Sequence, residues 1–146
     1  MNPPRLLSVL VVDDSALVRV RLRRLLEESD SRCVVMEAAS AADAARALRN
    51  FRPDVVVLDL SLPDGNGFDL LPRIKRAAPQ SAVILLTNHE GPDICQRALS
   101  LGADHYFRKS TEFELVPIVM QRVAARLRST VAANSTPSTQ VKGSQE

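Results

Sequence analysis

The chain has 146 residues, of which 45% are hydrophobic and 25% charged, with 19 Lys and Arg against 17 Asp and Glu. This balance is typical of one soluble globular domain with a short tail and argues against a disordered chain. A formal net charge of +2 is too small to indicate nucleic-acid binding, and 3% aromatic residues without Trp argue against a base-stacking surface. No apolar run is long enough to cross a bilayer. Cys33 and Cys95 lack zinc-ligand or disulfide-framework spacing, so we expect a reducing, cytoplasmic location.

Five apolar segments predict strands. They are Ser8–Val12, Cys33–Glu37, Val55–Leu58, Ala82–Leu86 and, more weakly, Tyr106–Phe107. The first four are almost continuously apolar, as in the strands of a parallel sheet that is buried on both faces.

Segments with helical periodicity alternate with these strands. The first has an apolar stripe made of Leu17, Val18, Leu22, Leu25 and Leu26. Ser40–Asp43 has the pattern of a capping box that opens the second helix, the third is expected at Gly67–Ala78, and Pro92 and Gly102 bracket the fourth. The alternation predicts an α/β fold with right-handed crossovers.

The fifth helix is expected to begin near Thr111–Glu114 and to reach Leu127. Pro117 either kinks this helix or moves its start downstream. After Arg128 the sequence is polar and lacks an apolar stripe, so we expect a folded domain over residues 1–128 and a disordered tail over residues 129–146.

Polar residues follow the predicted strands. Asp13 and Asp14 come after the first strand, Asp59 after the third, Thr87 after the fourth and Lys109 after the fifth. Each alone has an ordinary explanation, such as a helix cap, a turn residue or a solvated charge. Because ligands bind outside the carboxyl ends of the strands in open parallel sheets, the five together predict a site at one edge.

The charges at this edge indicate what the site binds. Two like charges about 4 Å apart repel by about 4 kcal/mol at an effective dielectric constant of 20, so three carboxylates hold a proton or recruit a cation. Oxygen ligands with room for water suit Mg²⁺. A divalent ion would let a phosphoryl group approach, with Asp59 as nucleophile and with Thr87 and Lys109 each contacting a phosphoryl oxygen.

The same residues carry a resemblance to the receiver domain of two-component response regulators, of the single-domain chemotaxis type. The matching segments are Val11–Ser15, Val57–Gly67, Leu85–Thr87 and Gly102–Lys109. The resemblance covers roughly residues 7–127. It implies a flavodoxin-like, doubly wound (βα)5 fold with a five-stranded parallel sheet in the order 2-1-3-4-5.

The resemblance also implies a role for each site residue. Asp59 resembles the phosphoacceptor, and Asp14, Asp59 and the backbone carbonyl of Ser61 resemble direct Mg²⁺ ligands. Asp13 would act through metal-bound water. Thr87 is similar to the switch hydroxyl of the family, and Tyr106 to the switch aromatic that rotates with it.

The sequence departs from the family pattern in two places. Ser110 stands where a proline with a cis peptide usually follows Lys109, so the Lys109–Ser110 peptide is either trans or a strained cis bond. Asn88 stands where Ala or Gly usually follows the switch hydroxyl, which predicts a slower reaction with small phosphodonors. His89 either faces the same entrance or is an ordinary exposed loop histidine.

The implied function is a switch in partner binding. A sensor histidine kinase or histidine phosphotransfer protein would phosphorylate Asp59, and an output protein would bind near the fourth helix, fifth strand and fifth helix. The arginines of the first helix, Arg19, Arg21, Arg23 and Arg24, form either a solvated face or part of the docking surface for the phosphodonor. No helix-turn-helix follows Leu127, so we expect no DNA partner, and we expect no membrane partner.

Two other functions stay open at this point. A receiver-like interaction module that has lost phosphorylation-dependent switching is favoured by Asn88 and Ser110. An aspartate-dependent phosphohydrolase is disfavoured, because such enzymes resemble Asp-x-Asp after the first strand, whereas Asp13 and Asp14 are adjacent. We therefore expect that the chain is not an enzyme.

Overall fold

The computed structural model describes residues 6–135, and its centre is a five-stranded sheet. The strands are β1 (Leu7–Val12), β2 (Cys33–Ala38), β3 (Val55–Leu58), β6 (Ala82–Thr87) and β7 (His105–Arg108). They are all parallel and lie in the order β2-β1-β3-β6-β7, which confirms the predicted sheet. A short antiparallel hairpin, β4 (Ser61–Leu62) and β5 (Gly65–Asn66), follows β3.

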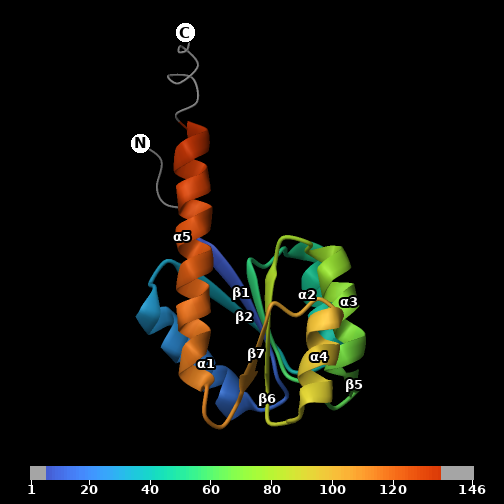
Figure 1. The fold of residues 1–146 in the computed structure, drawn as a ribbon. Helices are drawn as coiled ribbons and strands as arrows, with labels where there is room; N and C mark the ends of the chain where they lie inside the picture. The colour runs from blue at the N-terminus through green and yellow to red at the C-terminus, as the bar shows by residue number, and fades with distance from the viewer. Residues whose placement is uncertain (1–5, 136–146) are drawn as a thin grey trace.

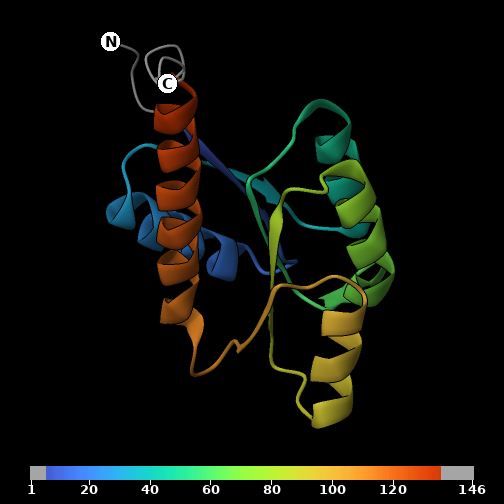
Figure 2. The ribbon, with the colours of Figure 1, turned by 45° about the horizontal axis from the view of Figure 1, so that its top comes forward.

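Helices cover both faces of the sheet. On one face lie α1 (Ala16–Ser29) and α5 (Val116–Ser135), and on the other lie α2 (Ala41–Asn50), α3 (Gly67–Ala77) and α4 (Pro92–Ser100) (Figures 1 and 2). Alternate strand residues point to opposite faces, so Val9 and Val11 join the core under α1 and α5, whereas Leu10 and Val12 join the other core. Two buried faces explain why these strands read as continuous apolar runs.

The helix starts follow the capping residues of the sequence. The Ser15 hydroxyl accepts a hydrogen bond from the Val18 amide at 3.2 Å, and the Ser40 hydroxyl accepts one from the Asp43 amide at 3.0 Å. The predicted capping box is only half formed, because the Asp43 carboxylate accepts from the Ala39 amide instead of the Ser40 amide.

The first helix does not bury the whole predicted stripe. Leu22 and Leu26 are fully buried, but Leu17 is 69% exposed. At about 100° per residue, Leu17 lies about 140° around the helix from the buried Leu22, so it is turned away from the core. The prediction that Leu17 faces the core is therefore wrong.

The fifth helix starts downstream of Thr111–Glu114, which is one of the two alternatives that Pro117 left open, and it ends later than predicted. A 3-10 helix at Phe113–Leu115 precedes it, so α5 begins at Val116 and Pro117 lies in its first turn, where a missing N–H costs no helical hydrogen bond. The helix continues to Ser135, so the predicted disorder is wrong for residues 129–135. No Gly or Pro interrupts that stretch, and Ser and Thr weaken a helix only slightly. The rest of the predicted tail, residues 136–146, lies outside the described residues.

Candidate functional site

The predicted site residues meet at the carboxyl edge of the sheet. Backbone hydrogen bonds continue the strand ladders past the strand ends, from the Asp13 amide to the Ala38 carbonyl and from the Asp59 amide to the Val12 carbonyl, each 3.0 Å long. The Lys109 amide donates to the Thr87 carbonyl at 2.9 Å. These bonds fix where the side chains of Asp13, Asp59 and Lys109 leave the sheet.

Three carboxylates gather at this edge. One oxygen from each of Asp13, Asp14 and Asp59 can be chosen so that all three lie within 4.8 Å of one another. Asp13 is 3% exposed and Asp59 is 6% exposed, whereas Asp14 is open to solvent. Carboxylates this close and this buried need a compensating cation.

Lys109 supplies part of that compensation. Its Nζ lies 2.7 Å from Oδ2 of Asp13 and 2.9 Å from Oδ2 of Asp59. Burial disfavours the charged amine, but the hydrogen bonds to Asp13 and Asp59 and the charges of both outweigh burial and raise the pKa of Lys109. No cis peptide bond occurs among residues 6–135, so the Lys109–Ser110 peptide is trans.

The remaining carboxylate oxygens fit a magnesium ion. Oδ1 of Asp13 accepts from the Ser15 amide at 2.9 Å and Oδ2 contacts Lys109, so both of its oxygens are engaged. Within the described chain, the Asp14 carboxylate and Oδ1 of Asp59 have no partner. Free carboxylate oxygens on Asp14 and Asp59 match the predicted direct ligands, and the engaged Asp13 matches a ligand through water.

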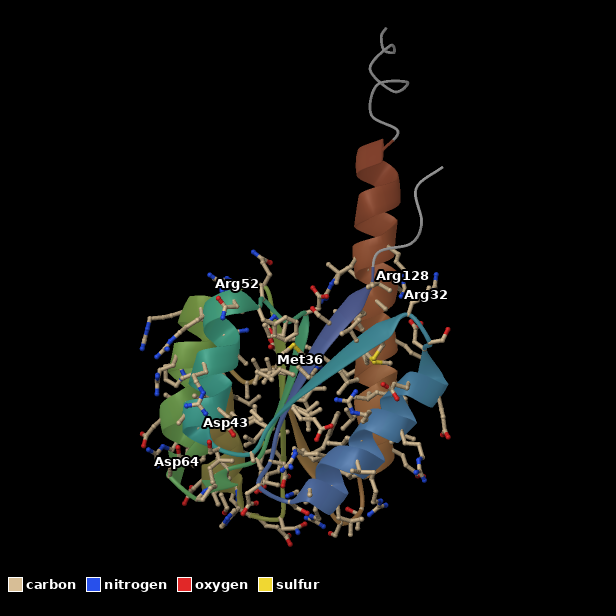
Figure 3. All side chains as sticks on the ribbon, turned by 180° about the vertical axis from the view of Figure 1, so that it is seen from behind. Arg32, Met36, Asp43, Arg52, Asp64 and Arg128 are labelled. Carbon is tan, nitrogen blue, oxygen red and sulfur yellow. The ribbon has the colours of Figure 1, made fainter. Side chains whose placement is uncertain are left out.

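The loop after Asp59 is held from two directions. The Asp64 carboxylate accepts hydrogen bonds from the Ala41 and Ala42 amides at 2.8 and 2.9 Å, which lower its pKa and tie the hairpin to the start of α2 (Figure 3). Gly67 begins α3 against the backbone of Asp59, where an added Cβ would lie 2.7 Å from the Asp59 carbonyl oxygen. A larger residue at position 67 would therefore displace the phosphoacceptor candidate.

Thr87 and Tyr106 are joined through His89. Thr87 is fully buried, and its hydroxyl accepts from the His89 amide at 3.2 Å. The Tyr106 hydroxyl donates to the His89 carbonyl, and burial raises the pKa of this hydroxyl, so it stays protonated. The His89 imidazole lies 2.7 Å, Nε2 to Oγ, from the hydroxyl of Ser61. Of the two alternatives for His89, the structure favours a place beside the site, but its individual contacts could not be predicted, because two of the three use backbone atoms.

A comparison with models of protein families identifies the family to which this chain belongs. The chain matches the model of the response regulator receiver domain over residues 9–119, and so it belongs to this family. Response regulator receiver domains are components of two-component systems, and an acidic pocket is typical of them. The resemblance carried by the strand-end motifs is therefore confirmed.

The chain matches nearly the full length of some similar proteins and only one part of others. Protein-glutamate methylesterase/protein-glutamine glutaminase 3 of Burkholderia thailandensis is 38% identical over 105 residues, which cover 71% of this chain and 29% of that protein. Protein CcdB of Bacillus subtilis is 36% identical over 115 residues, covering 79% of this chain and 95% of the relative. The chain thus spans about a third of the methylesterase relatives it matches.

A solved structure agrees with the fold. The signal receiver domain of a DNA-binding response regulator from Colwellia psychrerythraea superposes with a TM-score of 0.76 at 29% identity, covering 82% of this chain and 98% of that one. In the described part of this chain, no helix is both long and apolar enough to cross a membrane.

Proposed function

We propose that this chain is a single-domain response regulator of the cytoplasm that accepts a phosphoryl group on Asp59 from a sensor histidine kinase or a histidine phosphotransfer protein. One observation carries the proposal. The Asp59 carboxylate is nearly buried at the centre of the edge, with Lys109 on Oδ2 and no partner on Oδ1 within the described chain. A carboxylate held by one oxygen and free at the other is oriented to act as a nucleophile.

The transfer step follows from this geometry. Oδ1 of Asp59 attacks the phosphorus of a phosphohistidine, an O–P bond forms, and the N–P bond breaks as the electron pair returns to the imidazole nitrogen. Oδ2 of Asp59, once Lys109 releases it, would be the oxygen left for the metal. The product is an acyl phosphate on Asp59 and a free histidine on the donor. Lys109 pairs with a phosphoryl oxygen once its hold on Asp59 loosens, and the Thr87 hydroxyl donates to another.

Magnesium completes the site in this proposal. Asp14, Asp59 and the Ser61 carbonyl would hold it directly, and Asp13 would hold it through water. When bound, Mg²⁺ neutralises the carboxylates and the incoming phosphoryl oxygens. Lys109 alone cannot do this, because one ammonium faces two buried carboxylates and a third that is exposed.

The binding switch is proposed to run through Thr87, His89 and Tyr106. If the Thr87 hydroxyl turns to a phosphoryl oxygen, it no longer accepts from the His89 amide, and the His89 carbonyl that holds Tyr106 shifts with it. The output protein then recognises the altered surface of α4, β7 and α5. A change from mostly off to mostly on needs about 5.5 kcal/mol of differential stabilisation.

The phosphodonor is proposed to dock beside α1. Leu17 and Val20 are 69% and 48% exposed there, and they line a hollow with Arg21 and Arg24 next to Phe113. Exposed apolar side chains with an arginine rim are typical of a protein-binding surface. Under this proposal the chain has no diffusible substrate to turn over and no DNA or membrane partner.

The test is intact-mass spectrometry of the full chain after incubation with Mg²⁺ and either acetyl phosphate or a phosphorylated histidine kinase. We expect an adduct of about 80 Da, the mass of a phosphoryl group, that disappears in Asp59→Asn and persists in Asp69→Asn, an exposed carboxylate on α3. Absence of the adduct with every donor would overturn the proposal and favour a phosphorylation-independent interaction module.

A further inference from the structure

We propose that Arg19 is a positioning residue that holds the Asp13–Asp14 peptide, and through it the Asp14 carboxylate, ready for a divalent cation. This inference rests on the proposed function. Arg19 lies in the first turns of α1, and its side chain is 16% exposed. Its Nη1 donates to the backbone carbonyl of Asp13 at 2.7 Å.

The guanidinium of Arg19 is itself held from the neighbouring strand. Its Nε donates to Oε1 of Glu37 at 2.9 Å, and Oε2 of Glu37 accepts from Nε of Arg23 at 2.8 Å. The hydrogen bond from Arg23, aided by that from Arg19, outweighs burial and lowers the pKa of Glu37, so this carboxylate stays charged. Glu37 faces Val11 across the pairing of β1 and β2, which fixes it close to the loop that carries the two aspartates.

The hydrogen bond from Arg19 to the Asp13 carbonyl is expected to position the Asp14 carboxylate more than the Asp13 carboxylate. The Asp13 carbonyl belongs to the peptide that joins the two aspartates, and a planar peptide fixes the direction in which the next residue leaves. The Asp13 carboxylate has its own partners in Ser15 and Lys109. The Asp14 carboxylate is exposed and has no partner in residues 6–135, so its place depends on the backbone that Arg19 holds.

The charge of Arg19 and its proposed role in positioning Asp14 predict opposite changes in Mg²⁺ affinity when Arg19 is replaced. As a cation near the carboxylates, Arg19 opposes Mg²⁺ binding, so loss of its charge alone should strengthen binding. If Arg19 positions Asp14, the same loss should weaken binding. Mg²⁺ affinity of the unphosphorylated protein therefore separates the two effects by sign.

The experiment is calorimetric titration of the full, unphosphorylated chain with MgCl₂, using wild type, Arg19→Met, Arg19→Lys and Arg24→Met. Arg24 is exposed on the same helix and has no partner in the described chain, so Arg24→Met is a control with the same charge change. We expect Arg19→Met to weaken Mg²⁺ binding roughly 10-fold, as loss of outer-shell support commonly does. The Mg²⁺ affinity of Arg19→Lys should lie between those of wild type and Arg19→Met, because a lysine ammonium lacks the planar guanidinium that donates to both the Asp13 carbonyl and Glu37. Arg24→Met should bind Mg²⁺ as tightly as wild type or slightly more tightly.

The contrary outcomes are distinct. If wild type binds Mg²⁺ and Arg19→Met binds it equally or more tightly, Arg19 acts only through its charge and this inference is overturned. If wild type itself binds no Mg²⁺, the metal site of the proposed function fails and this inference fails with it. Thermal unfolding in EDTA monitors folding of each variant, and if Arg19→Met does not fold, weaker binding by Arg19→Lys than by wild type decides the question.

Discussion

The two regions that flank Asp59 are stabilised by different interactions. On the side of β1 and β7, Lys109 forms ion pairs with Asp13 at 2.7 Å and with Asp59 at 2.9 Å, and all three side chains are largely buried. On the side of the β6–α4 loop, the contacts are hydrogen bonds through His89, which is exposed together with its neighbours Asn88 and Glu90.

Because of this difference, we expect the two sides to serve different steps, namely phosphorylation on one side and the change in partner binding on the other. A buried charge that loses its partner costs several kcal/mol, so Lys109 is expected to leave Asp59 only for another anionic partner, such as a phosphoryl oxygen. A hydrogen bond of an exposed loop can be exchanged for one to water at little net cost, so the His89 side can rearrange. The phosphoryl group is therefore expected to be bound on the first side and reported by the second.

The largest expected effect is on the ion-paired side. Lys109→Met leaves two nearly buried carboxylates facing each other, so we expect the free energy of unfolding in EDTA at pH 8 to fall by about 3 kcal/mol. Added Mg²⁺ should recover part of this loss, because a cation that binds the folded state stabilises it. The measurement is urea unfolding with and without Mg²⁺. Stability equal to wild type in EDTA would mean that these pairs do not hold the site.

The next prediction concerns the switching side. Thr87→Val keeps the buried shape but removes the hydroxyl that accepts from the His89 amide. We expect Asp59 to be phosphorylated still, whereas the change in Tyr106 fluorescence that fluoroberyllate produces in wild type should be largely lost. Tyr106 is the single tyrosine in a chain without Trp, so its fluorescence reports this loop directly. Full retention of the Tyr106 response would exclude Thr87 from the switch.

A smaller effect is expected at the entrance beside Thr87. The Asn88 side chain is exposed and has no hydrogen bond within the described residues, so it is free to occupy the approach to Asp59. Asn88→Ala should raise the rate of labelling by acetyl phosphate roughly three-fold, or about 0.7 kcal/mol of barrier. Equal rates would remove Asn88 as an obstacle, and kinase-driven labelling serves as the comparison.

The smallest effect is expected from the Glu37 pairs that support Arg19. The pKa of Glu37 is lowered below its usual 4.5 by folding, so its contribution to stability is present above that value and is lost as the pH falls through the folded-state pKa. Glu37→Gln should therefore cost less than about 1 kcal/mol at pH 7, and this difference should shrink below pH 4.5. Urea unfolding at pH 7 and pH 3.5 measures it, with Glu114→Gln, an exposed residue on the 3-10 helix, as control. A difference that stays constant with pH would contradict the ion pairing.

The apolar pattern of the chain is enough to specify the sheet and the polar residues that lie at its edge. Continuous apolar runs have one stable place, between two helical layers, and parallel strands end at the same edge. Asp13, Asp59, Thr87 and Lys109 therefore had to meet wherever the chain formed that sheet.

Which polar atoms contact one another depends on how the helices and strands pack in three dimensions. Arg19 with Glu37 and Ser61 with His89 join side chains 18 and 28 residues apart, and no periodicity relates such positions. The exposure of Leu17, the trans peptide after Lys109 and the length of α5 depended likewise on how each helix and loop turns against its neighbours. Local patterns record which residues must be buried, whereas the partner of each polar atom is fixed only when whole elements pack.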